Sequence, residues 1–112
     1  MQYALLVYGN ETAFEKAPPD AREAIMKDFG AFAVATQKTG KCRGGEAFQP
    51  TRTATTVRAQ EGRVIMSDGP FGETKEQLGG FFLIDAANLD EAMEIAAGVP
   101  SVRIGGSIEI GP

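Results

Sequence analysis

The sequence predicts an α+β domain of the ferredoxin-like type, with two helices on one face of an antiparallel sheet. Its periodic segments run strand, helix, strand or hairpin, strand, helix, strand, which is the split βαβ order. The length of 112 residues suits one domain, residues 1–112, built around a single core. The chain is 43% hydrophobic and 23% charged, a balance typical of a folded globular protein.

The first strand is predicted over residues 3–8, an apolar run rich in Leu, Val and Tyr. Both faces of this strand are apolar, because the alternating sets are Tyr3, Leu5 and Val7 on one side and Ala4, Leu6 and Tyr8 on the other. A strand of this kind needs cover on both sides of its sheet.

The most strongly patterned helix is predicted to follow Pro18-Pro19, with Asp20 as its cap and Glu23 completing a capping box. Gly40 is predicted to end this helix. Its apolar stripe recurs at intervals of three and four residues and comprises Ile25, Met26, Phe29, Phe32, Ala33 and Thr36.

The middle of the chain contains four predicted strands. A short strand at 45–49 precedes a hairpin, whose strands are Thr53–Arg58 and Val64–Met66. A turn-rich segment then leads into Phe81–Ile84, a second strand that is apolar on both faces.

The second helix is predicted to begin after Asn88, its cap, and to end near Gly98 and Pro100. Its buried stripe comprises Leu89, Ala92, Met93 and Ala96. The last strand is predicted at Ser107–Ile110.

This order places both helices on one face of the sheet and leaves the other face apolar with nothing in the chain to cover it. A second copy of the chain, packed sheet to sheet, is the simplest cover for such a face. The sequence therefore predicts a homodimer.

The composition excludes several classes of function. The net charge is −4 and the basic residues are scattered, so we expect neither nucleic-acid binding nor a membrane partner. The apolar N-terminal run is too short for a signal peptide or a membrane span, and the single cysteine, Cys42, suits a reducing compartment. We therefore expect a cytoplasmic protein.

The chain contains no histidine. The commonest general base, the usual partner in a catalytic triad and the proximal haem ligand are therefore all missing. A four-ligand zinc site would need carboxylates and one cysteine, so we expect no metal and no other cofactor.

The segment Asp68–Phe81 gathers three acids, a lysine, a threonine and a glutamine between two core strands. Its sequence, DGPFGETKEQLGGF, resembles the signature of the DGPFAETKE family, within the YCII-related group of dimeric α+β barrel proteins. Gly72 stands where that family usually has alanine, and the match continues as far as Ile84. The similarity extends to most of the chain, including the segments Tyr3–Tyr8, Thr55–Arg58, Asn88–Ala92 and Gly106–Ile110.

The resemblance implies a ferredoxin-like protomer that pairs through its sheet into a barrel, with a cleft near the motif. It implies no particular reaction. Some YCII-related proteins are thought to use a histidine–aspartate pair, which this chain cannot supply. Members are often encoded beside sigma factors of the extracytoplasmic-function type, which implies a regulatory or stress context.

Three residues of the motif are candidate catalytic groups. Asp68 and Glu73 are candidates for moving a proton, and Lys75 for holding an anionic substrate. The alternative for Asp68 is an Asp-Gly turn, in which the carboxylate binds the backbone amide two residues on. The alternative for Glu73 and Lys75 is a solvated loop with weak ion pairs.

Four further residues are candidates for binding a small organic ligand. Thr74 and Gln77 are candidate hydrogen-bond donors within the motif, and Tyr8 ends the first strand with a hydroxyl that can reach the same cleft. Arg58 is a candidate for binding a carboxylate with two hydrogen bonds. A tyrosine with its hydroxyl in water and a surface arginine are the alternatives.

Three hypotheses follow for the function. The first is a cofactor-free acid–base enzyme, such as an isomerase, lyase or decarboxylase, that acts in a cleft near Asp68–Gln77. The second is a non-catalytic dimer that binds or senses a metabolite in the same cleft. In the third, the motif serves only folding and dimerisation, with Phe71 and Phe81 packing across the interface.

Overall fold

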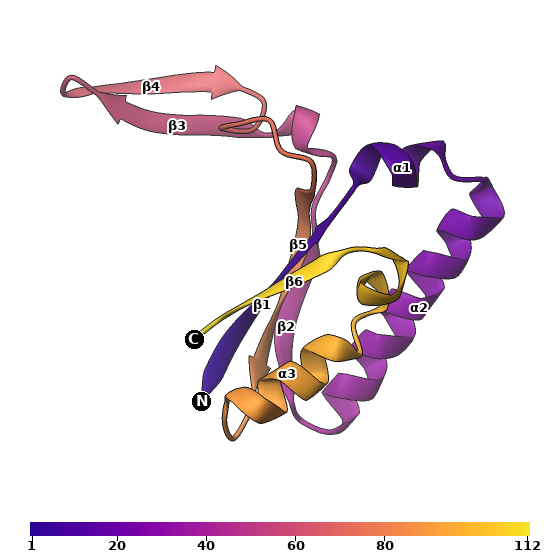
Figure 1. Cartoon of the computed structure of the whole chain (residues 1–112). Helices are drawn as coiled ribbons and strands as arrows, with labels where there is room; N and C mark the ends of the chain where they lie inside the picture. The colour runs from indigo at the N-terminus through magenta and orange to yellow at the C-terminus, as the bar shows by residue number, and fades with distance from the viewer.

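The computed structural model describes residues 1–112 and confirms the mixed α+β fold (Figure 1). Its helices and strands, in chain order, are β1 (Gln2–Gly9), α1 (Glu11–Lys16), α2 (Pro19–Lys38), β2 (Cys42–Ala47), β3 (Thr55–Gln60), β4 (Arg63–Asp68), β5 (Gln77–Asp85), α3 (Leu89–Ala97) and β6 (Ser107–Gly111). Two short 3₁₀ helices, η1 (Thr51–Thr53) and η2 (Pro100–Ile104), complete the chain.

The main sheet has four strands in the order β2-β5-β1-β6, and every neighbouring pair is antiparallel. This is the ferredoxin-like strand order predicted from the sequence, with β1 and β5 at the centre. The two apolar strands therefore occupy the two central positions, where each has a neighbour on both edges.

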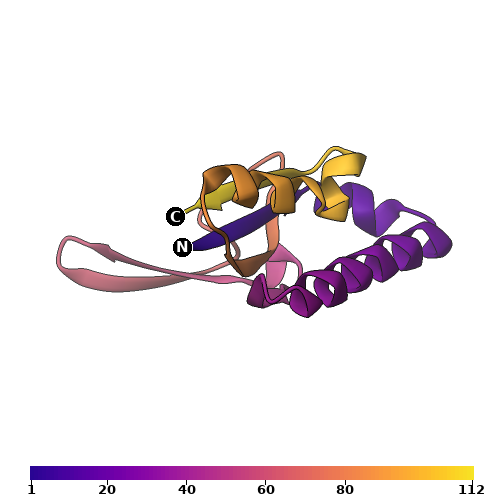
Figure 2. The ribbon, with the colours of Figure 1, turned by 90° about the horizontal axis from the view of Figure 1, so that it is seen from below.

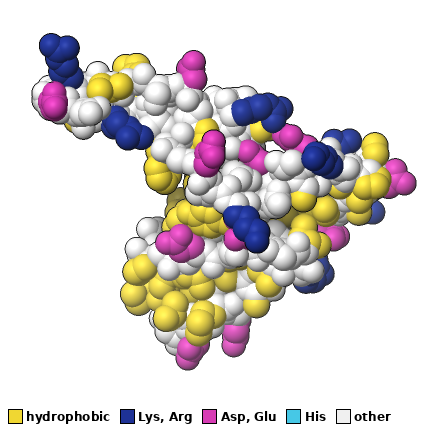
Figure 3. All heavy atoms as spheres, turned by 45° about the horizontal axis from the view of Figure 1, so that its top comes forward, with side chains coloured by type: hydrophobic (Ala, Val, Ile, Leu, Met, Phe, Trp, Pro, Cys, Tyr) yellow, Lys and Arg dark blue, Asp and Glu magenta, His cyan; other side chains and the backbone are white.

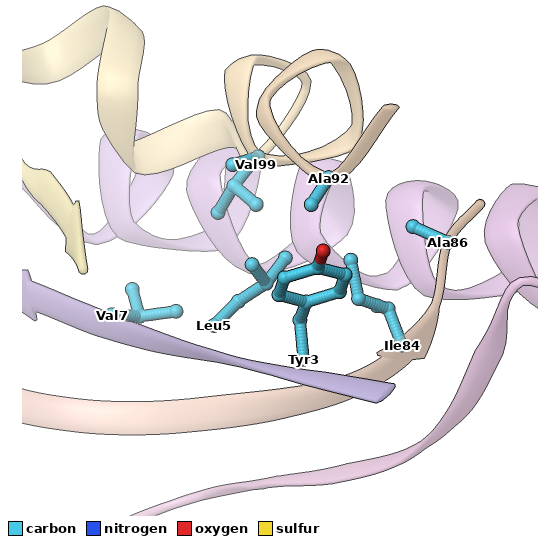
Figure 4. Close-up of a cluster of buried hydrophobic side chains, with 8 residues drawn as sticks. Tyr3, Leu5, Val7, Ile84, Ala86, Ala92 and Val99 are labelled. Atoms are coloured by element: carbon cyan, nitrogen blue, oxygen red, sulfur yellow. The ribbon is translucent and has the colours of Figure 1, made fainter. Parts of the chain in front are cut away.

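The core lies between the sheet and the helices, which share one face of it. Tyr3, Leu5 and Val7 of β1 point toward α3 and η2, as Figure 4 shows. From α2, the ring of Phe32 meets the ring of Phe82 edge to face, with centroids 5.2 Å apart. Burial of these apolar side chains is the main stabilising contribution to this side of the sheet.

The opposite face of the sheet, called the open face below, has no helix over it. On this face Ala4, Leu6 and Tyr8 are half-buried, and Leu83 is 44% exposed. The sequence-based expectation of an apolar sheet face left uncovered by the chain itself is therefore confirmed.

The predicted hairpin forms, but it stands outside the main sheet. Strands β3 and β4 pair only with each other, and the ribbon they form projects from the body (Figures 1 and 2). Its tight turn uses Glu61 and Gly62, both with positive φ, as two-residue hairpin turns require. We call residues 55–68 the arm and the rest of the chain the body.

The helix boundaries differ in places from the predictions. An additional helix, α1, begins after Asn10, whose side chain accepts a hydrogen bond of 3.0 Å from the Ala13 N–H. The predicted capping role of Asp20 is wrong, because α2 begins at Pro19 and Asp20 lies within its first turn. The fixed φ of proline suits the first helical position, and no side-chain cap forms there.

Other predicted helix ends are confirmed. Asn88 caps α3 by accepting a hydrogen bond of 3.0 Å from the Glu91 N–H. Gly40 follows α2 with a φ of 73°, a left-handed conformation that glycine adopts without a steric penalty. No helix is both long enough and apolar enough to cross a lipid bilayer.

Candidate functional site

A groove of about 1130 Å³ lies where the base of the arm, the motif and the ends of β1, β5 and β6 meet. We call it the front groove; Figure 3 shows the molecule hollowed between the arm and the body. Its apolar lining includes Phe48, Phe71 and Leu78, and its polar lining includes Tyr8 and Glu109. The groove thus combines an apolar wall with a few polar groups, as small-molecule sites usually do.

Tyr8 and Glu109 form one polar corner of the front groove. They lie on the neighbouring strands β1 and β6, where Tyr8 pairs with Ser107 and Leu6 pairs with Glu109. The two side chains are therefore diagonal neighbours on the open face. Burial of Tyr8 raises its pKa, and the charge and hydrogen bonding of Glu109 raise it further. Like an ordinary tyrosine, Tyr8 is protonated at neutral pH, and the raised pKa keeps its hydroxyl protonated to higher pH.

Ser107 and Glu76 form a second polar contact beside this corner. The Ser107 hydroxyl lies 3.1 Å and 3.3 Å from the two carboxylate oxygens of Glu76. The contact joins the motif to the last strand of the sheet. It places the Glu76 carboxylate on the same groove as Tyr8 and Glu109.

Thr74 and Gln77, two candidate binding residues of the motif, form hydrogen bonds with other residues of the chain. The Thr74 hydroxyl donates to the Glu76 carbonyl. The Gln77 side-chain nitrogen donates to the Thr74 carbonyl at 2.6 Å, and its oxygen accepts from the Glu11 N–H at 3.0 Å. Both residues line the front groove, but they chiefly fix the path of the motif.

Helix α1 fixes the position of the short helix η1, which lines the front groove through Thr51. The carboxylate of Glu11 accepts hydrogen bonds from the Thr51 N–H, at 3.1 Å, and from the Thr51 hydroxyl. Glu15 forms an ion pair of 2.6 Å with Arg52. The short helix η1 is therefore attached to α1 at two successive residues.

The three candidate catalytic residues lie outside the front groove. Asp68 ends β4, Glu73 and Lys75 lie in the following loop, and all three are exposed and form no hydrogen bond or ion pair through their side chains. The turn alternative for Asp68 also fails, because the residue two positions on is Pro70, which has no N–H.

Arg58 and Phe71 are both exposed in the single chain, and only Phe71 lines the front groove, so its packing across a dimer interface stays a prediction. Arg58 is exposed on the arm and does not line the front groove. Phe71 is 80% exposed, whereas Phe81 packs against Phe48 with ring centroids 5.9 Å apart. The structure thus brings together Tyr8, Thr74 and Gln77, and it separates them from the other four candidates.

A second groove, of about 1120 Å³, lies between α2 and the sheet and shares several lining residues with the front groove, among them Tyr8, Glu76, Gln77 and Ser107. Ile25 and Phe29 of α2 face it, and Lys75 is the one candidate catalytic residue that lines it. Its lining combines apolar side chains with charged ones, including Glu11, Glu46 and Lys75, so unlike the front groove it offers a ligand a cation.

Glu76, Ser107 and Glu109 line the front groove but were not among the residues predicted from the sequence. A signal for Ser107 and Glu109 was present, because Ile108 and Ile110 alternate with them and mark the face of β6 that packs on the core.

No group of three side chains of the kinds that bind metal ions comes together anywhere in the chain.

Comparison with known proteins gives two matches of essentially full length. The model of the YCII-related domain matches residues 1–111. An uncharacterised protein of Rhizobium meliloti (strain 1021) is 39% identical over 113 residues, which cover 100% of this chain and 91% of that protein. The resemblance drawn from the motif is therefore confirmed, and the chain belongs to the family of proteins with a YCII-related domain.

Proposed function

We propose that this protein is a homodimer that binds a small molecule in the front groove. The observation that carries the proposal is the pairing of Tyr8 with Glu109 beside the Ser107–Glu76 contact, at the edge of an apolar wall. A donor hydroxyl and two carboxylates converge there on a space large enough for a small organic ligand.

The charges of the front groove indicate the class of ligand. Neither a lysine nor an arginine lines it, whereas two glutamates, Glu76 and Glu109, do. A carboxylate or phosphate ligand would therefore meet like charge without a compensating cation. A neutral or cationic molecule with an apolar body and a hydroxyl or amino group fits the lining better. The anion-binding role considered for Lys75 has no counterpart in this groove.

Binding without catalysis is the hypothesis that the geometry favours. Asp68 and Glu73 lie away from the groove, and Tyr8 is held as a protonated donor rather than as a base. Thr74 and Gln77 stabilise the loop of the motif through their hydrogen bonds to its backbone. A ligand-sensing or regulatory module needs only the groove, whereas an acid–base enzyme also needs a proton-transferring group positioned on the substrate.

The open face supports the dimeric part of the proposal. Ala4, Leu6 and Leu83 lie on it beside the ring of Phe81, with no helix over them. Contact with the same face of a second copy would bury these side chains from water, as in a two-fold symmetric interface.

A thermal-shift screen against metabolites grouped by charge tests the proposed function. Neutral or cationic hits should raise the melting temperature of the wild type. The same hits should raise it much less in Tyr8→Phe and Glu109→Gln, because each variant removes one polar group of the groove. Lys75→Ala is the matched control, since this exposed side chain lies outside the front groove.

Two results would contradict the proposed ligand class and site. Hits confined to anionic compounds would contradict the charge argument. Hits lost in Lys75→Ala but kept in Glu109→Gln would place the ligand in the second groove, because Lys75 lines only that groove and Glu109 only the front groove.

A further inference from the structure

The arm is a ribbon with one apolar face and one polar face. Alternate residues of a strand point to opposite sides, and the cross-strand partners of the hairpin share a side. The register therefore groups the pairs Val57–Met66 and Ala59–Val64 on one face. The pairs Arg58–Ile65 and Gln60–Arg63 lie on the other face. This alternation is typical of a sheet that is covered on one side only.

The apolar face of the arm is uncovered within the chain. Val57 is 61% exposed, Val64 69% and Met66 71%. Every residue of β3 and β4 except the half-buried Thr56 is exposed. A two-stranded ribbon without further packing is marginally stable in water, and a projecting apolar strand is prone to self-association.

The charge of the arm is compatible with a second copy of this chain as the cover. Within the arm, Arg58 and Arg63 balance Glu61 and Asp68, so the net charge of −4 resides entirely on the body. Two acidic bodies repel each other at close range. An arm that is neutral overall, placed against the partner, adds apolar contact without adding to this repulsion.

The size of the available apolar surface also supports a contact between the arm and a second copy of the chain. With usual strand spacings, the open face of the four-stranded sheet measures about 320 Å² in projection over five paired residues. The apolar face of the arm adds about 190 Å² by the same reckoning, which enlarges the surface by more than half. In a two-fold dimer each protomer would contribute its own arm and the surface beneath the partner's arm, so the contact would grow from about 320 Å² to about 700 Å² in projection on each partner. A stable interface buries about 800 Å² of accessible surface on each partner, a size that the open face alone does not approach.

From these observations we infer that the arm is a dimerisation element, whose apolar face packs on the second copy of the chain. Each arm contacts the partner in a two-fold dimer, so the contact occurs twice. The inference rests on the proposed homodimer and adds to it a surface that lies outside the main sheet. Val57, Val64 and Met66 are the side chains that this contact buries.

The experiment compares two double variants on the same strand. Val64→Glu with Met66→Glu places two charges on the apolar face, and Ile65→Glu with Ser67→Glu places the same two charges on the polar face. Leu83→Glu places a charge on the open face of the sheet. The dimer dissociation constant of each full-length protein is measured by sedimentation velocity, and circular dichroism checks that each variant is folded.

We expect the apolar-face variant to raise the dissociation constant at least tenfold and the polar-face variant to change it less than threefold. An effect of Leu83→Glu alone would overturn the inference about the arm while leaving the dimer through the sheet intact. A monomeric wild type, or equal effects of the two arm variants, would also overturn it. Ligand binding by the thermal-shift assay is measured separately, so failure of the groove is distinguishable from failure of the arm.

Discussion

The side-chain oxygen of Gln77 accepts a hydrogen bond of 3.0 Å from the backbone N–H of Glu11. This contact joins the end of the motif to the first turn of α1, across 66 positions of sequence. The same glutamine donates to the carbonyl of Thr74. One side chain therefore fixes the loop and satisfies a helix N–H that has no partner within its own helix.

Gln77→Ala should lower the stability of the protein by about 1 kcal/mol, because both hydrogen bonds are lost. The melting temperature should fall by roughly 4 °C or more for a chain of this size. Lys75→Ala, two residues away on an exposed side chain without hydrogen bonds, should change it little. Equal melting temperatures for the two variants would show that Gln77 does not hold the loop.

Gly80→Ala should destabilise the protein by about 1–3 kcal/mol, as overpacking in a core does. A Cβ at residue 80 would lie 2.5 Å from the backbone oxygen of Glu46 on the neighbouring strand, so β2 and β5 would have to separate. Gly30→Ala is the matched substitution, because nothing lies within 4 Å of its Cβ position. In the middle of α2 it should stabilise the helix by about 0.5–1 kcal/mol. Urea denaturation measures the free energy of unfolding of both variants, which should fall for Gly80→Ala and rise for Gly30→Ala.

Glu91 should contribute stability at neutral pH that is lost in acid. Hydrogen bonds from Lys41 and then from the Ala87 N–H lower its pKa below the ordinary value of 4.5. A carboxyl whose folded pKa is lowered stabilises the fold above its unfolded pKa, and this contribution disappears as the pH falls through the folded pKa.

The melting temperature of Glu91→Gln should therefore lie below that of the wild type at pH 7 and approach it below the pH range of this titration. Glu94→Gln, on the same helix but without an ion pair, is the control. A gap between Glu91→Gln and the wild type that is equally wide at pH 7 and in acid would contradict the linkage to Glu91.

Tyr8 should ionise at higher pH than an ordinary tyrosine, because of its burial and the neighbouring Glu109. The chain has two tyrosines and no tryptophan, so Tyr3→Phe leaves Tyr8 as the only strong ultraviolet chromophore that titrates. In that background, Glu109→Gln should move the titration seen in the absorbance spectrum to lower pH. An unchanged titration would show that the two side chains are not coupled.

Much of the fold could be predicted because it follows local patterns. Short runs of residues that are apolar on both faces located β1 and β5, and Asn88 and Gly40 marked helix ends. The short helix α1 was missed because six residues carry little periodic signal, although Asn10 is a good cap. The position of the arm outside the sheet depends on how the chain turns after β2, and local propensity does not encode that direction.

The candidate site was harder to predict, because local patterns do not give the direction in which each side chain points. The motif marked the correct region, but side chains that are adjacent in sequence leave a loop in different directions. Asp68 and Lys75 thus point away from the front groove, whereas Glu76 points into it. Glu109 comes from the last strand and joins Tyr8 only through the pairing of β6 with β1, which no short window of sequence contains.

The central position of β1 has a consequence for the order in which the chain folds during its synthesis. Both neighbours of this strand, β5 and β6, lie far downstream, and Ala4 pairs with Gly111 near the other end of the chain. At a synthesis rate of about 5–20 residues per second, the most apolar strand waits several seconds for its partners. The arm needs only its own fourteen residues, 55–68, and can form as soon as they emerge. The strand that is made first thus gains its first neighbour only when β5 emerges and its second only when β6 is complete.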